Sequence, residues 1–279
     1  MADTVATLDP TNIRGEREAA AARMRERSLA QYPAVCERLA GRGIDPQPLV
    51  GTAPDGTPLT VAGFYMLMRG FAVTEKAGFT PTFQAARLAL DTPLPARVRE
   101  TMFVALNQQS SEEAAHGDKI FGAVYFALGG VPAALEDDDG LQENNFLQPT
   151  ADREMNLRIL LDFEALLGGV ETLALTQAFP LVLDVCQRWQ HPLARELSRM
   201  VTDNVRPEES RHVLAWRYLF REVVAQRGDD AIERYYTMTN WGRDRFLAER
   251  MPRDEFNRHM QASTPTTEQL LGRPMPLSA

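Results

Sequence analysis

The sequence predicts an all-α protein built from long helices. Three observations support this fold class: long stretches rich in helix-forming residues, Gly and Pro residues where these stretches end, and no alternating apolar runs joined by hairpin turns. Several stretches cover about 25 to 35 residues, whereas the mean α-helix of a globular protein has roughly 11. Helices of this length favour a long bundle over a compact α-helical fold.

The first half of the chain contains four of the expected helices. A region rich in Ala, Arg and Glu forms the first, and a stretch with several Gly and Pro residues separates it from the others. Pro81 is expected to begin a short helix of its own, because proline suits a first turn better than a helix interior. The expected helices cover about 16–39, 60–76, 81–91 and 95–128, with the turn-rich stretch at 41–58.

The second half contains three expected helices, at about 152–178, 191–226 and 230–250. Gly168 and Gly169 should interrupt the first of these helices, and Pro180 should end it. Pro207 lies inside the second helix and should bend it, because proline removes a backbone donor. We expect an acidic loop at 136–140 and an irregular C-terminal arm.

Composition and charge exclude several functions. The apolar (44%) and charged (24%) fractions are ordinary for a globular protein, and the formal charge of −8 argues against a broad nucleic-acid surface. The N-terminus lacks an apolar signal region, and no uncharged apolar run reaches the roughly 20 residues of a membrane span. We therefore expect a cytoplasmic protein that binds neither nucleic acid nor a membrane.

Two of the four histidines occur in the pattern Glu-x-x-His. Glu113 precedes His116 in EEAAHGD, and Glu209 precedes His212 in PEESRH. Residues three apart in a helix project from one face, so each pair directs a carboxylate and an imidazole to one point. Chance alone gives two such pairs in roughly a few per cent of chains of ordinary composition. The pattern therefore favours metal ligands. The alternative interpretation is two solvated surface pairs, each stabilising its helix by about a few tenths of a kcal/mol.

Two such motifs on facing helices are typical of a site that binds two metal ions. Such a site needs one further Glu from each of two other helices. Between the motifs, Glu164 and Glu171 are seven residues apart and therefore lie on nearly the same helix face. Upstream, Glu75 lies at the end of an apolar segment and is the candidate ligand. The alternative interpretation is a surface residue at a helix end. Carboxylate oxygens with one imidazole per ion suit iron or manganese. Weaker upstream candidates are Glu37 and Glu100.

These motifs resemble those of known dinuclear-iron families. EEAAHGD resembles the first iron-binding motif of soluble acyl-carrier-protein desaturases, and PEESRH resembles the second motif of desaturases, ribonucleotide reductase small subunits and the related ligand-binding oxidases. VETLALT resembles the helix-three glutamate segment of those oxidases. The resemblance implies a ferritin-like four-helix bundle core at about 60–227, with additional helices at both ends of a single domain, 1–279. It implies six metal ligands: Glu75, Glu113, His116, Glu171, Glu209 and His212.

The sequence departs from each family at specific positions. Ribonucleotide reductase small subunits usually carry a radical tyrosine four residues after the first histidine, where this chain has Ile120. The ligand-binding oxidases form a Val–Tyr crosslink at positions that here hold Gly78 and Leu166. Arylamine N-oxygenases add a histidine ligand at the position of Val205. A ribonucleotide reductase subunit and an N-oxygenase of that type are therefore disfavoured, and the Val–Tyr crosslink cannot form.

Two features beside the motifs each have two interpretations. Glu208, directly before Glu209, either accepts a hydrogen bond from a ligating imidazole or faces solvent near a helix bend. Gly168 and Gly169 either leave room for substrate beside Glu171 or allow close helix packing.

The expected function is that of a dinuclear-metal oxidase or oxygenase. Two iron ions, or one manganese and one iron, would use dioxygen to oxidise a small or hydrophobic organic substrate by hydroxylation, desaturation or oxidative cleavage. The expected catalytic carboxylates are Glu113, Glu171 and Glu209. A ferredoxin or flavoprotein would supply electrons, and the chain should form a homodimer. The alternatives are a ferroxidase or iron-storage protein, and a helical interaction protein without metal.

Overall fold

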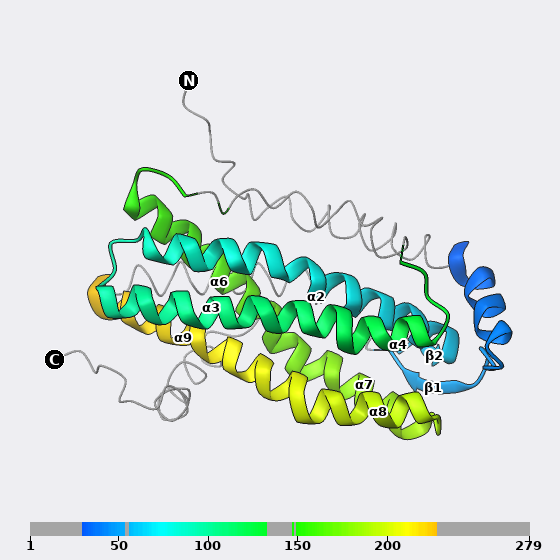
Figure 1. The fold of residues 1–279 in the computed structure, drawn as a ribbon. Helices are drawn as coiled ribbons and strands as arrows, with labels where there is room; N and C mark the ends of the chain where they lie inside the picture. The colour runs from blue at the N-terminus through cyan, green and yellow to red at the C-terminus, as the bar shows by residue number, and fades with distance from the viewer. Residues whose placement is uncertain (1–29, 54–55, 133–146, 148, 228–279) are drawn as a thin grey trace.

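The computed structural model describes residues 30–53, 56–132, 147 and 149–227. Helix dominates these ranges, and four long helical segments lie side by side (Figure 1). The all-α prediction is therefore confirmed for the described part. The expected helix at 230–250, the acidic loop, the C-terminal arm and most of the expected N-terminal helix lie outside the described residues.

The first long segment is the helix α2, Val61–Leu90, which begins after the capping residue Thr60. The prediction of two helices separated near Pro81 was wrong, because α2 is continuous through this residue. The hydroxyl of Ser110, on the next segment, donates to the Phe79 carbonyl at 3.0 Å. Packing of α2 along its length outweighs the single backbone hydrogen bond that proline removes.

The second segment contains α3 (Ala96–Ala115), the π-helix η1 (His116–Phe121) and α4 (Gly122–Ala127). The expected helix at 95–128 is confirmed. The π-helical turn that begins at His116 is a feature that the sequence did not predict.

The third segment contains α6 (Arg153–Leu173), the π-helix η3 (Ala174–Ala178) and α7 (Phe179–Arg188). Two predictions were wrong here, since the helix neither breaks at Gly168 nor ends at Pro180. Pro180 lies in the first turn of α7, directly after η3, where a missing backbone donor costs little.

The fourth segment contains α8 (Pro192–Met200), the π-helix η4 (Val201–Val205) and α9 (Arg206–Arg227). It confirms the helix expected at 191–226. Pro207 is the second residue of α9, so the irregular turn η4 precedes the proline.

A helix at 30–41 and a short β-hairpin precede the long segments. The hairpin joins β1 (Leu49–Thr52) and β2 (Pro58–Thr60) in antiparallel pairing, and β1 contacts α7. It begins in the stretch 41–58, which was expected to be rich in turns, and it ends at Thr60. Strands of four and three residues are too short to give a detectable alternating pattern.

Two apolar clusters form the core of the four long segments. One cluster includes the N-terminal half of α2, η1, α4, α7, α8 and η4, and the other includes the C-terminal part of α2 and parts of α3, α6 and α9. Along α2, for example, Ala72 belongs to the first cluster and Ala85 to the second. The zone between the clusters contains most of the buried acidic residues.

One helical stretch, Leu167–Arg188, is long and apolar enough to cross a membrane by length and composition, with a mean hydropathy of 1.3. Interior helices of soluble proteins meet the same criteria, and this stretch contains the buried residues Glu171 and Phe179. It is therefore weak evidence for a membrane span. The cytoplasmic location stays a prediction.

Candidate metal centre

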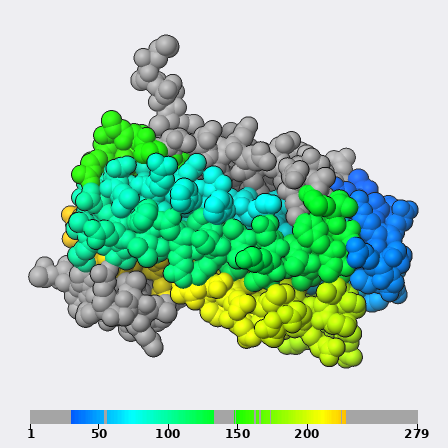
Figure 2. Space-filling view, in the orientation of Figure 1, coloured from blue at the N-terminus to red at the C-terminus, as the bar shows by residue number. Residues whose placement is uncertain are grey.

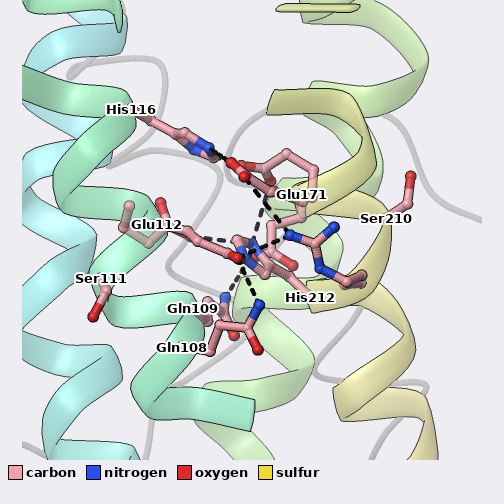
Figure 3. Close-up of polar contacts among 12 residues, drawn as sticks. Gln108, Gln109, Ser111, Glu112, His116, Glu171, Ser210 and His212 are labelled. Carbon is pink, nitrogen blue, oxygen red and sulfur yellow. Dashed lines mark hydrogen bonds and ion pairs between the residues drawn. The ribbon is translucent and has the colours of Figure 1, made fainter. Parts of the chain in front are cut away.

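The two Glu-x-x-His motifs face each other from neighbouring segments. Glu113 and His116 lie where α3 passes into η1, and Glu209 and His212 lie in the first two turns of α9. The three-residue spacing turns both side chains of each motif toward the partner helix. Figure 3 shows His116 and His212 entering the space between these helices.

The structure brings all six predicted site residues together. They form two overlapping groups in which the candidate ligand atoms lie within 4.8 Å of one another. Both groups share Glu113 and Glu209, and each adds one histidine and one further glutamate. The first group adds Glu75 and His116, and the second adds Glu171 and His212.

The whole cluster is buried. The exposed fraction is highest for Glu75, at 7%, and lowest for His116, at 0%. Figure 2 shows the side chains of the α3 and α9 segments in contact along one face of the molecule. Burying several carboxylates without compensation is costly, so this arrangement requires positive charge nearby.

A close helix contact carries Glu75 to the site. Gly117, directly after His116, lies against α2, where a Cβ at this position would be 2.7 Å from the backbone nitrogen of Lys76. Glycine therefore permits the approach of α2 to η1 that brings Glu75 to His116. The alternative interpretation of Glu75 as a surface residue is wrong.

The inner nitrogen of each histidine faces the carboxylates. His116 Nδ1 lies 3.2 Å from Glu75 Oε2 and 3.2 Å from Glu209 Oε1. His212 Nδ1 lies 3.5 Å from both Glu113 Oε1 and Glu171 Oε1. The two imidazole centroids are 6.4 Å apart, so each histidine serves one side of the cluster.

The outer nitrogen of each histidine contacts an acid from the opposite motif. His116 Nε2 lies 2.6 Å from Glu208 Oε2, while His212 Nε2 lies 2.7 Å from Glu112 Oε2. Each acid directly precedes a motif glutamate, but it contacts the histidine of the opposite motif. Arg211 links them, at 2.8 Å from Glu112 and 3.7 Å from Glu208. Glu208 is therefore an imidazole partner rather than a solvent-facing acid.

Sequence reasoning overlooked Glu112. The available signal was the doublet Glu112–Glu113, which the second motif repeats as Glu208–Glu209. Although burial opposes its ionisation, hydrogen bonds with His212, Gln108 and Arg211 lower the pKa of Glu112 to about 2. This acid is thus a permanent anion, suited to hold an imidazole N–H.

Burial and mutual repulsion favour protonation of the carboxylates in the cluster. Burial raises the pKa of Glu171 to about 8, and burial together with Glu75 and Glu209 raises the pKa of Glu113 well above its ordinary value. Burial disfavours the charged imidazole of His116, yet hydrogen bonds that its ring donates to Glu209 and Glu75 raise its pKa to about 11. Without a bound cation, protons on these side chains thus reduce the repulsion among the carboxylates.

Unpaired ligand atoms provide a second test of whether cations fit. Glu171 Oε2 is buried without a hydrogen-bond partner among the described residues, whereas Glu209 Oε1 and His212 Nδ1 make the charge contacts given above. Such atoms are expensive to bury unless they coordinate an ion. Four carboxylates would neutralise two divalent cations, and this donor set suits iron or manganese. The residues therefore fit a pair of cations.

The remaining acidic candidates do not join the cluster. Glu37 and Glu100 are exposed. Glu164 is buried, with 1% exposure, but belongs to neither group of candidate ligands, and its Oε1 has no hydrogen-bond partner among the described residues. Of the two glutamates on α6, Glu171 is therefore the one at the cluster.

Gly168 on α6 reflects close packing. A Cβ at Gly168 would lie 1.8 Å from the indole ring of Trp216, so this ring fills the space that a substrate was considered to use. Trp216 is a core residue of α9 with 4% exposure. Gly78 on α2 likewise lies close to the site, since a Cβ there would be 3.3 Å from Glu113 Oε2.

The chain matches no model of a known protein family, no curated protein and no solved structure. The description of this centre therefore rests on the geometry of its own residues.

Proposed function

We propose that the protein is a non-haem dinuclear-metal oxidase or oxygenase of the ferritin-like kind, which uses dioxygen to oxidise a small or hydrophobic organic substrate. The observation that carries this proposal is the pair of overlapping groups that share Glu113 and Glu209. Four helical segments that each direct ligands inward support a ferritin-like four-helix bundle.

Each residue of the centre has a role in this proposal. Glu113 and Glu209 would contact both ions, and Glu75 and Glu171 would contact one ion each. His116 and His212 would anchor the two ions through Nδ1, since their Nε2 atoms face Glu208 and Glu112. When bound, two iron ions, or manganese with iron, supply a binding site for dioxygen and electrons for its reduction.

The surroundings of the centre favour an apolar substrate. On one side of the cluster, Phe121 stacks on Phe71 with centroids 4.8 Å apart and lies 6.3 Å from Phe179. All three π-helical turns lie on this same side, beside the apolar cluster that contains these rings. π-Helical turns occur frequently at functional sites. We therefore infer that a substrate on this side of the centre would be apolar.

The chemistry requires a source of electrons. Hydroxylation of a C–H bond uses one dioxygen, two electrons and two protons, and it yields an alcohol and one water. A ferredoxin or a flavoprotein is the proposed donor. The homodimer also stays a prediction, which sedimentation equilibrium of the full chain can test.

The proposal is tested by loading the protein with Fe(II) under nitrogen, reducing it and exposing it to dioxygen with a set of hydrophobic substrates. Mass spectrometry should detect a product that gains one oxygen atom from ¹⁸O₂ or loses two hydrogens. Accumulation of far more than two iron ions per chain as a ferric mineral, without any organic product, would instead indicate a ferroxidase.

A further inference from the structure

Gln109 is a buried polar residue that belongs to neither group of candidate ligands. It lies on α3 one turn before Glu113 and has 2% exposure. Its Nε2 donates a hydrogen bond to Glu171 Oε1 over 2.5 Å, from α3 to α6 (Figure 3). Gln109 therefore contacts a glutamate of the site although it is not a ligand itself.

The contact distinguishes the two oxygens of Glu171. An ionised carboxylate only accepts hydrogen bonds, so the NH₂ end of the Gln109 amide is the end that must face it. This amide occupies Oε1, while Oε2 is buried without a hydrogen-bond partner in the described part of the chain. Gln109 therefore fixes the oxygen that lies 3.5 Å from His212 Nδ1, and it leaves Oε2 without a partner.

The two halves of the cluster differ at this point. The second motif has Val205 at the position equivalent to Gln109, four residues before its glutamate. Val205 is completely buried and offers no side-chain donor. Glu75, the counterpart of Glu171, makes its hydrogen bond with the His116 ring at 3.2 Å. The two half-sites therefore contain the same ligand types but support their unshared glutamates differently.

We propose that Gln109 is a positioning residue that fixes the carboxylate of Glu171 beside His212 and thereby makes the two ion positions inequivalent. This inference rests on the proposed dinuclear metal site. It concerns the ion beside His212, because Glu171 and His212 occur in the same group of candidate ligands. The ion beside His116 should depend little on Gln109.

The test is a titration with Co(II) under nitrogen, which needs no dioxygen and no substrate. Gln109→Met keeps an unbranched side chain of similar length and removes the donor. It is introduced into two backgrounds: His116→Ala, which keeps the half-site beside His212, and His212→Ala, which keeps the other. The matched control is Gln84→Met, on a half-buried glutamine of α2.

In the His116→Ala background, Gln109→Met should weaken Co(II) binding by about 10- to 100-fold, the usual effect of losing a partner that orients a ligand. In the His212→Ala background, the change should stay within about threefold, as it should for Gln84→Met in both backgrounds. An equal loss in both backgrounds, or no loss in either, would overturn the role of Gln109.

Two further measurements keep the outcome clear. If Gln109→Met does not fold, as judged by circular dichroism, Gln109→Asn withdraws the amide by one methylene group and should weaken the same half-site. If the unmodified protein binds no Co(II), the proposed metal site itself fails. If it binds two ions and Gln109→Met and Gln109→Asn titrate like the unmodified protein, the positioning role alone fails.

Discussion

Glu112 on α3 lies 2.7 Å from Nε2 of His212 on α9, so the acid that orients this histidine comes from the opposite motif. The Glu208–His116 contact, at 2.6 Å, repeats the arrangement in the other direction. An acid at Nε2 holds the proton on that nitrogen and leaves Nδ1 as the electron-pair donor. Because each acid lies on the helix opposite to its histidine, the position of one helix determines the tautomer of the histidine on the other.

Removing this orienting acid should weaken metal binding. We expect Glu112→Ala to lower metal affinity by about 10- to 100-fold, because His212 loses the partner that fixes its ring. Anaerobic Co(II) titration against a competing chelator measures the effect. Glu196→Ala is the control, since Glu196 pairs with Arg199 on the exposed face of α8. An affinity equal to that of the unmodified protein would show that the contact has no role in binding.

The histidine ligands are tested by their removal. We expect His116→Ala and His212→Ala each to lower the metal content from about two ions per chain and to abolish dioxygen-dependent oxidation, because neighbouring carboxylates then repel one another without an anchored ion. Elemental analysis after anaerobic reconstitution provides the measurement. His191→Ala is the matched control, because His191 caps α8 and stacks on Trp189, outside the cluster. Full metal content in both motif variants would contradict the assignment.

The fold was predictable from the sequence wherever a signal was local. Helical composition and capping gave the segments at 95–128 and 191–226, and the i, i+3 spacing gave the two motifs. The continuity of α2 through Pro81 was not predictable, because it depends on packing against α3. The three π-helical turns have no known composition signal, and the short hairpin is stabilised by its contact with α7.

The candidate site was predictable in part. The motif residues follow from spacing alone, whereas the choice of Glu171 over Glu164 required the resemblance of VETLALT to a known segment. Sequence spacing does not show that Glu112 contacts His212 rather than a residue of its own helix. The contact of Gln109 with Glu171 is equally non-local, since 62 residues separate them.

Glu164 and Glu171 should respond differently to the same isosteric change. Glu171→Gln should reduce metal occupancy, because an amide replaces a carboxylate ligand. Glu164→Gln should leave occupancy unchanged, since Glu164 lies outside both groups of candidate ligands. Elemental analysis of the two variants side by side decides the point. Normal occupancy in Glu171→Gln together with loss in Glu164→Gln would reverse the assignment.

Glu164 should also affect stability in a pH-dependent way. Burial, together with the nearby Glu171, raises its pKa well above 4.5 in the folded protein. The folded state then binds more protons than the unfolded state, so its stability falls as pH rises above 4.5, by up to about 1.4 kcal/mol per pH unit. Metal-free Glu164→Gln should lack this contribution. Urea unfolding at pH 5, 6 and 7 should show an advantage for the variant that grows with pH, and a constant difference would contradict the prediction.

Metal binding should release protons. In the metal-free protein, the raised pKa values of Glu171, about 8, and His116, about 11, keep both groups protonated at neutral pH. Cations require the deprotonated forms, so affinity should increase from pH 6 to pH 8, by about tenfold per pH unit for each proton released. Calorimetry in two buffers of different ionisation enthalpy measures this release. A pH-independent affinity would show that these groups do not bind the ion.

The two groups that share Glu113 and Glu209 are expected to hold two metal ions. The most direct measurement is a crystal structure of protein reconstituted anaerobically with Fe(II) and Mn(II), with anomalous scattering recorded at the iron and manganese edges. Two anomalous peaks are expected, both in contact with Glu113 and Glu209, one beside His116 and the other beside His212. Crystals that show no anomalous peak between these residues after reconstitution would contradict it.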